Sequence, residues 1–185
     1  MTTLAVILAV VLAAGIIWYN RLVRGRNRVD TAWSDIDVQL QRRHDLVPRL
    51  VSAVRQYAAY ERATLEAVTE LREQAMRAAD IAARGELEAE LSGCVDRLIA
   101  LAENYPDLKT SENFLSLQQE LVQTENYLQF ARRYYNGSVR DYNTAVESVP
   151  GNIVAYLFRF SARPFFQKAA DDVANVPLVR LGSVE

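Results

Sequence analysis

Residues 4–29 read LAVILAVVLAAGIIWYNRLVRGRNRV, an apolar run without charge that ends in a cluster of arginines. Residues 2–19 carry no charged side chain. At the usual rise per residue they form about 27 Å of helix, close to the hydrocarbon thickness of a bilayer. The sequence therefore predicts a transmembrane anchor over residues 1–20. The residues expected to hold it, from the apolar interior through the interface to the basic flank, are Leu4, Val10, Ile16, Trp18, Tyr19, Arg21 and Arg24.

The distribution of charge around this run predicts its orientation. No lysine or arginine precedes it, whereas four arginines follow between residues 21 and 28. Cytoplasmic flanks of membrane helices carry an excess of basic residues, so we expect the N terminus outside and the rest of the chain in the cytoplasm. A cleaved signal peptide is the alternative, but it would need basic residues before the apolar run and a small-residue cleavage site after it. The lipid bilayer is thus the first expected partner.

Beyond the anchor, composition and periodicity favour helix. The chain has only seven Gly and five Pro, and apolar positions recur in alternating steps of three and four, as in coiled coils and bundles. We expect an all-α domain over residues 21–168, a bundle of long antiparallel helices, and a loosely ordered tail over 169–185. Three long helices and a short fourth segment are expected at about 21–84, 86–104, 114–149 and 153–160, with Gly85 as the cap of the first.

Several residues interrupt this pattern. Arg43 and Glu61 fall at seam positions, where a charged side chain is either exposed or paired across the bundle. Pro48 removes one backbone hydrogen bond to the carbonyl of His44, so a bend is expected there. The two phenylalanines in residues 163–166 (Arg-Pro-Phe-Phe) are expected to dock against the bundle.

Residue types that carry catalysis are scarce. His44 is the only histidine and Cys94 the only cysteine. A di-iron carboxylate bundle needs two Glu-x-x-His pairs, and the sequence lacks zinc spacing, the Gly-x-Ser-x-Gly nucleophile motif and Gly-rich nucleotide loops. The net charge of −2 gives no broad positive field for a nucleic acid. We therefore expect no enzymatic activity, catalytic residue, cofactor, metal or nucleic-acid partner.

Two segments are unusually polar for helices of a bundle. They are AWSDIDVQLQRRHDLVPRLV over residues 32–51 and ENYPDLKTSENFLSLQQELVQTE over residues 103–125. Complementary charges on two neighbouring helices can form a buried network that fixes their register, and they can equally present a surface to a partner. The candidate residues for such a polar network or partner surface are Asp37, Arg43, Asp45, Glu61, Glu120, Glu125, Arg132 and Asn136.

At these two segments the sequence closely resembles the LemA family of bacterial membrane-anchored helical proteins. The similarity extends over nearly the whole chain and includes, in order, Tyr19-Asn20, Arg26-Asn27, Ala32-Trp33, Asp35 to Leu40, Arg42-Arg43, Asp45 to Pro48, Asn104 to Pro106, Asn113-Phe114, Glu120-Leu121, Thr124-Glu125, Ala131 to Asn136 and Pro164 to Phe166. The resemblance implies an inner-membrane protein with its N terminus outside and a cytoplasmic helical bundle, and it adds no catalytic residue. It also implies that relatives associate with membrane proteases, other small membrane proteins or specialised intracellular membranes.

These observations give one leading hypothesis and two alternatives. The leading hypothesis is a membrane-anchored, non-catalytic scaffold or adaptor that binds a membrane protease, another small membrane protein or a second copy of itself. One alternative is a self-assembling protein that organises membranes. The other is an enzyme or metal-binding bundle whose clustered ionisable residues would be Asp37, Asp45, Glu120, Glu125 or His44.

Overall fold

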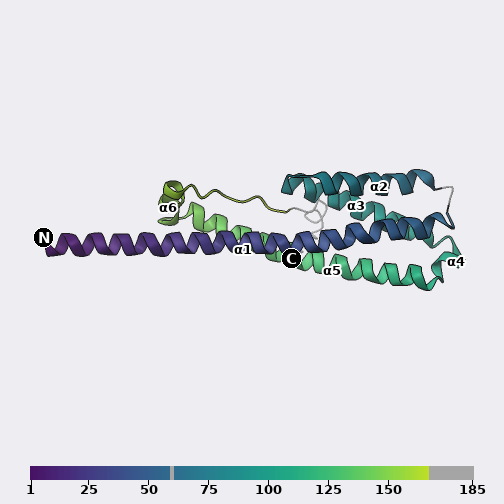
Figure 1. Ribbon diagram of the computed structural model, residues 1–185, viewed down its shortest axis with the longest axis horizontal. Helices are drawn as coiled ribbons and strands as arrows, with labels where there is room; N and C mark the ends of the chain where they lie inside the picture. Colours follow the sequence, from purple (N-terminus) through teal and green to yellow (C-terminus); the bar gives the residue numbers. More distant parts are fainter. Residues whose placement is uncertain (59–60, 167–185) are drawn as a thin grey trace, which may run out of the picture.

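The computed structural model describes residues 1–58 and 61–166, and within these ranges the regular structure is helical, without a strand. The all-α prediction is therefore confirmed. The helices, in chain order, are α1 (Thr2–Arg55), α2 (Arg62–Arg77), α3 (Ile81–Ala102), α4 (Pro106–Lys109), α5 (Glu112–Glu147) and α6 (Gly151–Phe158), as labelled in Figure 1.

The first helix, α1, has 54 residues, and its apolar start has different surroundings from the rest of the helix. The apolar side chains of residues 4–17 are exposed, and this part projects beyond all the other helices (Figure 1). It is long and apolar enough to cross a membrane. From Leu22 onward, α1 buries a regular series of side chains against the rest of the protein. The predicted order, a long apolar N-terminal helix followed by a helical bundle, is confirmed.

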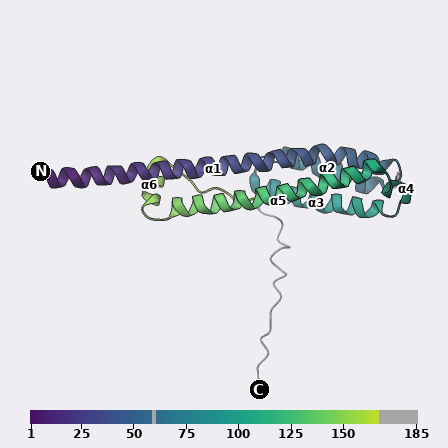
Figure 2. The same ribbon diagram turned by 90° about the horizontal axis from the view of Figure 1, so that it is seen from below.

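The bundle is built from the second half of α1 together with α2, α3 and α5. α2 runs back antiparallel to α1, α3 reverses direction again, and α5 returns along α1 toward its exposed half (Figures 1 and 2). These four helices enclose an apolar core at the end of the bundle farthest from the N terminus. Its members include Val47, Leu50, Val54, Leu65, Val68, Leu91, Leu98, Phe114 and Leu117.

Nearer the N terminus, α1 and α5 continue as a pair with a second apolar cluster between them. Gly25 allows a close approach of the two helices, because a Cβ atom at this position would lie 3.1 Å from the Tyr142 ring. After α6 the chain turns back as an extended segment, residues 159–166, that we call the strap (Figure 1). The cluster consists of Val29, Ala32, Ile36, Leu40, Leu128, Tyr135, Val139, Tyr142 and the strap residue Phe166.

The predicted extent of the first helix is wrong. The chain leaves α1 after Arg55, and a separate helix, α2, begins at Arg62. Gly85 is no cap, since it lies inside α3; this helix begins after Asp80, whose carboxylate accepts a hydrogen bond from the Ala83 backbone N–H at 2.9 Å. An aspartate in this position satisfies a backbone donor that the first turn leaves free, which is why α3 begins before the glycine.

The third and fourth predicted segments correspond to α5 and α6, with bounds shifted by about two residues. Pro48 lies inside α1, which continues through it as a helix to Arg55. The predicted tail at 169–185 lies outside the described residues.

Candidate functional site

A buried polar network joins α1, α3 and α5 in the middle of the bundle. Glu88 of α3 is fully buried, with its Oε1 2.7 Å from Nε2 of His44 and its Oε2 3.6 Å from Nη1 of Arg43. The same Arg43 nitrogen lies 3.6 Å from Oε2 of Glu125 on α5, and the Arg43 guanidinium also donates to the hydroxyl of Ser92. Arg43 thus reaches two helices from a third.

This arrangement places charge where the bundle would otherwise be apolar. Because the side chains of His44 and Glu88 are 0% exposed, a ligand at the surface cannot touch them. A buried carboxylate is tolerated only when cationic or hydrogen-bonding groups surround it. The network thus joins α1, α3 and α5 through contacts that only one register of these helices satisfies.

A second polar contact compensates for Pro48. Proline has no backbone N–H, so the carbonyl of His44, four residues earlier, loses its usual partner in the helix. The Nε atom of Arg72, on α2, donates a hydrogen bond to this carbonyl oxygen at 2.6 Å. The proline thus creates an acceptor through which α2 is attached to α1.

Replacing Arg72 by methionine should lower the free energy of unfolding by about 1.5–3 kcal/mol, the usual contribution of a hydrogen bond from a charged group. In a Pro48→Ala background the restored N–H of residue 48 can bond to the His44 carbonyl, so the same change should cost less. Urea unfolding of the four proteins of this double-mutant cycle measures the difference. An equal cost in both backgrounds would show that the freed carbonyl is not what holds Arg72.

The strap is held on α5 by two asparagines that lie seven residues apart, on one face of the helix. Asn143 accepts a hydrogen bond from the Arg163 N–H at 2.8 Å and donates to its carbonyl at 2.9 Å. Asn136 makes the same pair of bonds with the backbone of Phe166, at 2.9 and 3.0 Å. The hydroxyl of Tyr135 donates to the carbonyl of Pro164 at 2.9 Å. Each asparagine side chain therefore bonds both the N–H and the carbonyl of one strap residue, as the backbone of a neighbouring β-strand would.

Aromatic contacts and one ion pair complete this attachment. The ring of Phe166 lies 5.5 Å from that of Trp33, and Arg163 reaches Asp30 of α1 at 3.1 Å. Burial raises the pKa of the Tyr135 hydroxyl above its ordinary value, and the positive charge of Arg163 opposes this rise. The prediction that the two phenylalanines dock is confirmed for Phe166, which is fully buried, and wrong for Phe165, which is exposed. Adjacent residues of an extended segment point to opposite sides, so only one of them can face the bundle.

Replacing Asn143 by alanine should release the strap while leaving the bundle folded, because two hydrogen bonds to the Arg163 backbone are lost. The expected loss of local stability is about 1–3 kcal/mol. Amide hydrogen exchange should accelerate in residues 159–166 and stay unchanged in α2 and α3. The matched control is Asn126→Ala, an exposed asparagine on the same helix. If both variants exchange like the wild type, the asparagine pairing does not hold the strap.

The outward face of α5, opposite to its packed side, is apolar and amide-rich. A shallow hollow of about 410 Å³ on this face is lined by Leu115, Gln118, Gln119, Val122, Gln123 and Asn126, none of which is charged. Farther along the helix, Phe130 and Tyr134 are exposed as well, and the guanidinium of Arg133 lies 4.8 Å from the Phe130 ring. We call Leu115, Val122, Phe130 and Tyr134, with the amides between them, the α5 outer face.

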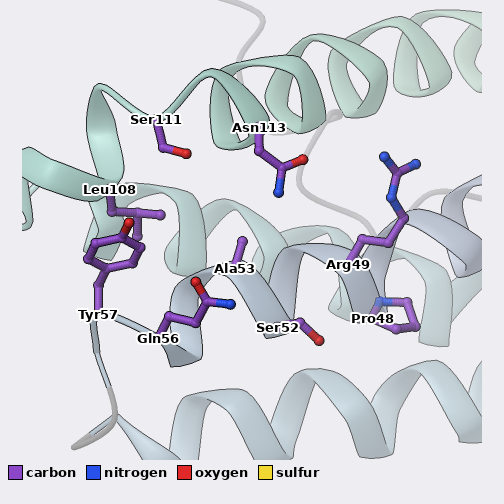
Figure 3. A pocket seen from close by; sticks show the side chains of 9 residues that line it. All are labelled: Pro48, Arg49, Ser52, Ala53, Gln56, Tyr57, Leu108, Ser111 and Asn113. Carbon is purple, nitrogen blue, oxygen red and sulfur yellow. The ribbon is translucent and has the colours of Figure 1, made fainter.

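A second hollow, of about 370 Å³, lies at the end of the bundle farthest from the N terminus. It is bordered by α1, by α4 and by the start of α5, and Figure 3 shows the Tyr57 ring beside Leu108 at one end and Arg49 at the other. Among the nine described residues that line it, Arg49 is the one with a charged side chain, and no imidazole or carboxylate accompanies the hydroxyls of Ser52 and Ser111. The lining offers hydrogen bonds to a ligand.

The residues predicted from the sequence are divided between the core and the surface. Arg43 and Glu125 are brought together, as described above. Asp37 is exposed and lies 2.9 Å from Arg84 of α3. Asp45 accepts a hydrogen bond from Gln41, one turn earlier on α1, at 2.9 Å.

The others lie in three different places. Glu120 forms an exposed ion pair with Arg49 at 3.4 Å, which links α5 to α1. The guanidinium of Arg132 lies 5.3 Å from the Phe166 ring, and Asn136 binds the strap as described above. Glu61 is half-buried and directly precedes α2, away from the expected seam.

The sequence analysis did not identify Glu88 as a member of the buried network. It also did not identify the strap as the segment that the two Tyr-Asn pairs of α5 bind. Glu88 stands on the same helical face as Leu91, Val95, Leu98 and Ala102, so a charge within an apolar seam was the available signal. The Tyr-Asn pairs at residues 135–136 and 142–143 were recognisable as a repeat. No periodicity indicated that an extended segment twenty to thirty residues later would be their partner.

Comparison with known proteins finds one matching family model and several relatives. The family model described as the LemA family matches residues 32–180. The magnetosome protein MamQ 2 of Paramagnetospirillum magneticum is 24% identical over 179 residues, which cover 81% of this chain and 65% of the relative. Protein LemA of Metamycoplasma hominis is 26% identical over 156 residues, which cover 80% of this chain and 71% of the relative. The chain thus spans about 65% of the length of the MamQ 2 relative.

Proposed function

Because the chain belongs to the LemA family, whose model matches residues 32–180, we propose that it is a single-pass protein of the bacterial inner membrane that acts as a non-catalytic scaffold. In this proposal residues 1–20 form the anchor, and the apolar start of α1 crosses the bilayer. The bundle stands on the cytoplasmic side and binds another protein through the α5 outer face. The relatives named above come from bacteria, which agrees with this assignment.

The proposed orientation rests on the basic residues that follow the apolar segment. Arg21 and Arg24 are exposed at the point where the apolar half of α1 ends, and the Arg21 guanidinium lies 4.9 Å from the Trp18 ring. Basic residues collect on the cytoplasmic side of membrane helices, and tryptophan favours the interface. The tryptophan therefore supports an interface at this point of α1, and the arginines support a cytoplasmic bundle.

The observation that carries the scaffold proposal is the composition of the α5 outer face. A helix face directed to water is normally rich in charged side chains, whereas the core of a protein–protein interface is depleted of charge and enriched in aromatic residues. Between Leu115 and Phe130 the outer face has no charged side chain, and its apolar residues are exposed, with Val122 at 61% and Phe130 at 63%. The composition of this face therefore resembles that of a protein–protein interface more than that of a solvent-exposed helix face.

The ionisable side chains considered for an enzyme or a metal site support the non-catalytic part of the proposal. Asp37, Asp45, Glu120 and Glu125 each have an arginine or glutamine neighbour, and His44 is enclosed by the bundle. Carboxylates already occupied by cations or amides contribute to surface pairing and helix register.

Self-assembly is a second candidate function, and the same face favours it. Two copies of an uncharged helix face can meet about a two-fold axis without repulsion between like charges. In this alternative the partner is another copy of the chain, and the assembled copies would organise the membrane that holds them.

Site-specific photocrosslinking in native membranes tests the proposal and separates the two partners. A benzophenone amino acid is placed at Val122, or at Glu66 as a control, whose side chain is 71% exposed on α2. Adducts with a different protein at Val122, absent at Glu66, are the expected result. Adducts with the chain itself would favour self-assembly, and equal or no crosslinking at the two positions would overturn both.

A further inference from the structure

α6 is a short helix with an exposed apolar surface and no charged residue. The sequence from 149 to 158 reads VPGNIVAYLF, and α6 itself begins at Gly151. Tyr156 is 90% exposed and Leu157 71% exposed, while Gly151 and Ala155 face the protein and are buried. Nothing in the packing of the described chain covers the side of α6 that carries Ile153, Tyr156 and Leu157.

Contacts with α1 place this helix at the end of the apolar segment. A Cβ atom at Gly151 would overlap the carbonyl oxygen of Ala145 and come within 3.2 Å of the Trp18 ring, so glycine permits the close approach. The Phe158 ring lies 4.8 Å from that of Tyr19. Both ends of α6 are therefore at the level of Trp18 and Tyr19, where the apolar half of α1 gives way to arginines.

The direction of α6 agrees with a position in the membrane interface. Figures 1 and 2 show that it runs across the long axis of α1 and does not follow it. When α1 stands across a bilayer, such a helix lies near the plane of the membrane. The chain then leaves this level through the strap, whose Phe160 ring lies 5.4 Å from the guanidinium of Arg26.

The surroundings on the bundle side are basic. A hollow of about 600 Å³ between α1 and α5 is lined in part by Arg21, Arg24, Arg28 and Arg140, with Asp141 as an acidic member. Arginines at this level meet lipid phosphates, each contributing about 1 kcal/mol near an anionic surface. An apolar helix surface next to a basic rim has the charge distribution of an interfacial membrane helix.

We propose that α6 inserts its exposed apolar side into the lipid interface, so that the protein contacts the bilayer at two places, through α1 and through α6. The occupant of this surface is phospholipid. Interfacial helices bury their apolar side about 5–10 Å into the boundary between headgroups and acyl chains. Because α5 and the strap are attached to both ends of α6, the second contact would fix the rotation of the bundle about α1 as well as its distance from the membrane. This inference rests on the proposed membrane span.

The test measures the depth of single fluorescent labels in the full-length protein. Cys94 is replaced by alanine, and NBD is attached to one new cysteine at a time in vesicles of phosphatidylethanolamine and phosphatidylglycerol. The positions are Tyr156→Cys in α6, Ile7→Cys in the apolar segment, and Arg62→Cys at the start of α2, whose side chain is 84% exposed. Lipids with a nitroxide in the headgroup or on the upper acyl chain quench labels according to depth.

The Tyr156→Cys label should have blue-shifted emission and be quenched by the shallow nitroxides, while the Arg62→Cys label should be unaffected. A Tyr156→Cys label that behaves like the Arg62→Cys label overturns the inference. A blue shift that appears only at high protein-to-lipid ratios and is not accompanied by nitroxide quenching overturns it too, because a second copy of the protein then covers the helix in place of lipid. Leu157→Cys repeats the measurement at an independent position, and circular dichroism verifies that each variant is folded.

The Ile7→Cys label separates the two proposals. If lipid quenches Ile7→Cys but not Tyr156→Cys, the span holds and only the inference about α6 fails. If lipid does not quench Ile7→Cys, the membrane span and the inference about α6 fail together.

Discussion

Replacing Glu88 by alanine should lower the free energy of unfolding by about 3–5 kcal/mol, as expected when one partner of a buried ion pair is removed. The carboxylate is the neighbour that Arg43 and His44 share inside the bundle, and Arg43 is itself only 5% exposed. Without Glu88, a cationic guanidinium stays in the core with Glu125 as its remaining carboxylate. Urea unfolding of the full-length protein in detergent, followed by circular dichroism, measures the change.

The chain provides a matched control for this substitution. Arg49 and Glu120 also form an ion pair between two helices, but both side chains are exposed, at 54% and 44%. Exposed pairs contribute at most about 1 kcal/mol, so Glu120→Ala should have a small effect. A further variant, Arg43→Met with His44→Leu and Glu88→Leu, replaces the three buried ionisable members of the network by apolar groups and should be near neutral. Equal effects of Glu88→Ala and Glu120→Ala would show that burial of the network does not matter.

The long apolar N-terminal helix and the helical class were predictable because both depend on local composition. The apolar run has a sharp end at the arginines, and the seam of α5 repeats Leu117, Leu121 and Leu128 at helical spacing. The chain reversal after α1 was not predictable in this way. Residues 56–61 contain no glycine or proline, and the apolar positions of α2 continue the rhythm of α1 almost in phase. The spacing of apolar residues indicates which face of a helix is buried, but it does not indicate where the helix ends and the chain reverses direction.

The candidate site was partly predictable for a related reason. Pairing between neighbouring helices was one of two interpretations of the polar segments, the other being a partner surface, and Arg43 with Glu125 and Arg49 with Glu120 are such pairs between α1 and α5. Glu88 belongs to a third helix whose position depends on the unpredicted reversal, so its meeting with His44 could not be foreseen. The strap is held by hydrogen bonds between asparagine side chains and a backbone without regular structure. Such bonds produce no repeating residue pattern, so the position of the strap could not be predicted from the sequence.

Replacing Leu128 by alanine should lower the free energy of unfolding by about 2–5 kcal/mol, because the change removes buried methyl groups and leaves a cavity. Leu128 is fully buried in the cluster that holds α5 against α1, together with Ile36, Leu40 and Tyr135. Leu121, which is 7% exposed in the other core, belongs to the same class, and its replacement should fall in the same range. Urea unfolding measures both.

The comparison that makes this prediction informative is Val122→Ala, one residue after Leu121 but on the exposed outer face of α5. Val122 is 61% exposed, so truncating it should change stability by less than about 0.5 kcal/mol. If the α5 outer face binds a partner, Val122→Ala should weaken crosslinking to that partner while the urea midpoint stays where it was, whereas Leu128→Ala should shift the midpoint. A stability loss at Val122 equal to that at Leu128 would mean that the outer face is packed within the protein, and the surface assigned to a partner would be part of the core.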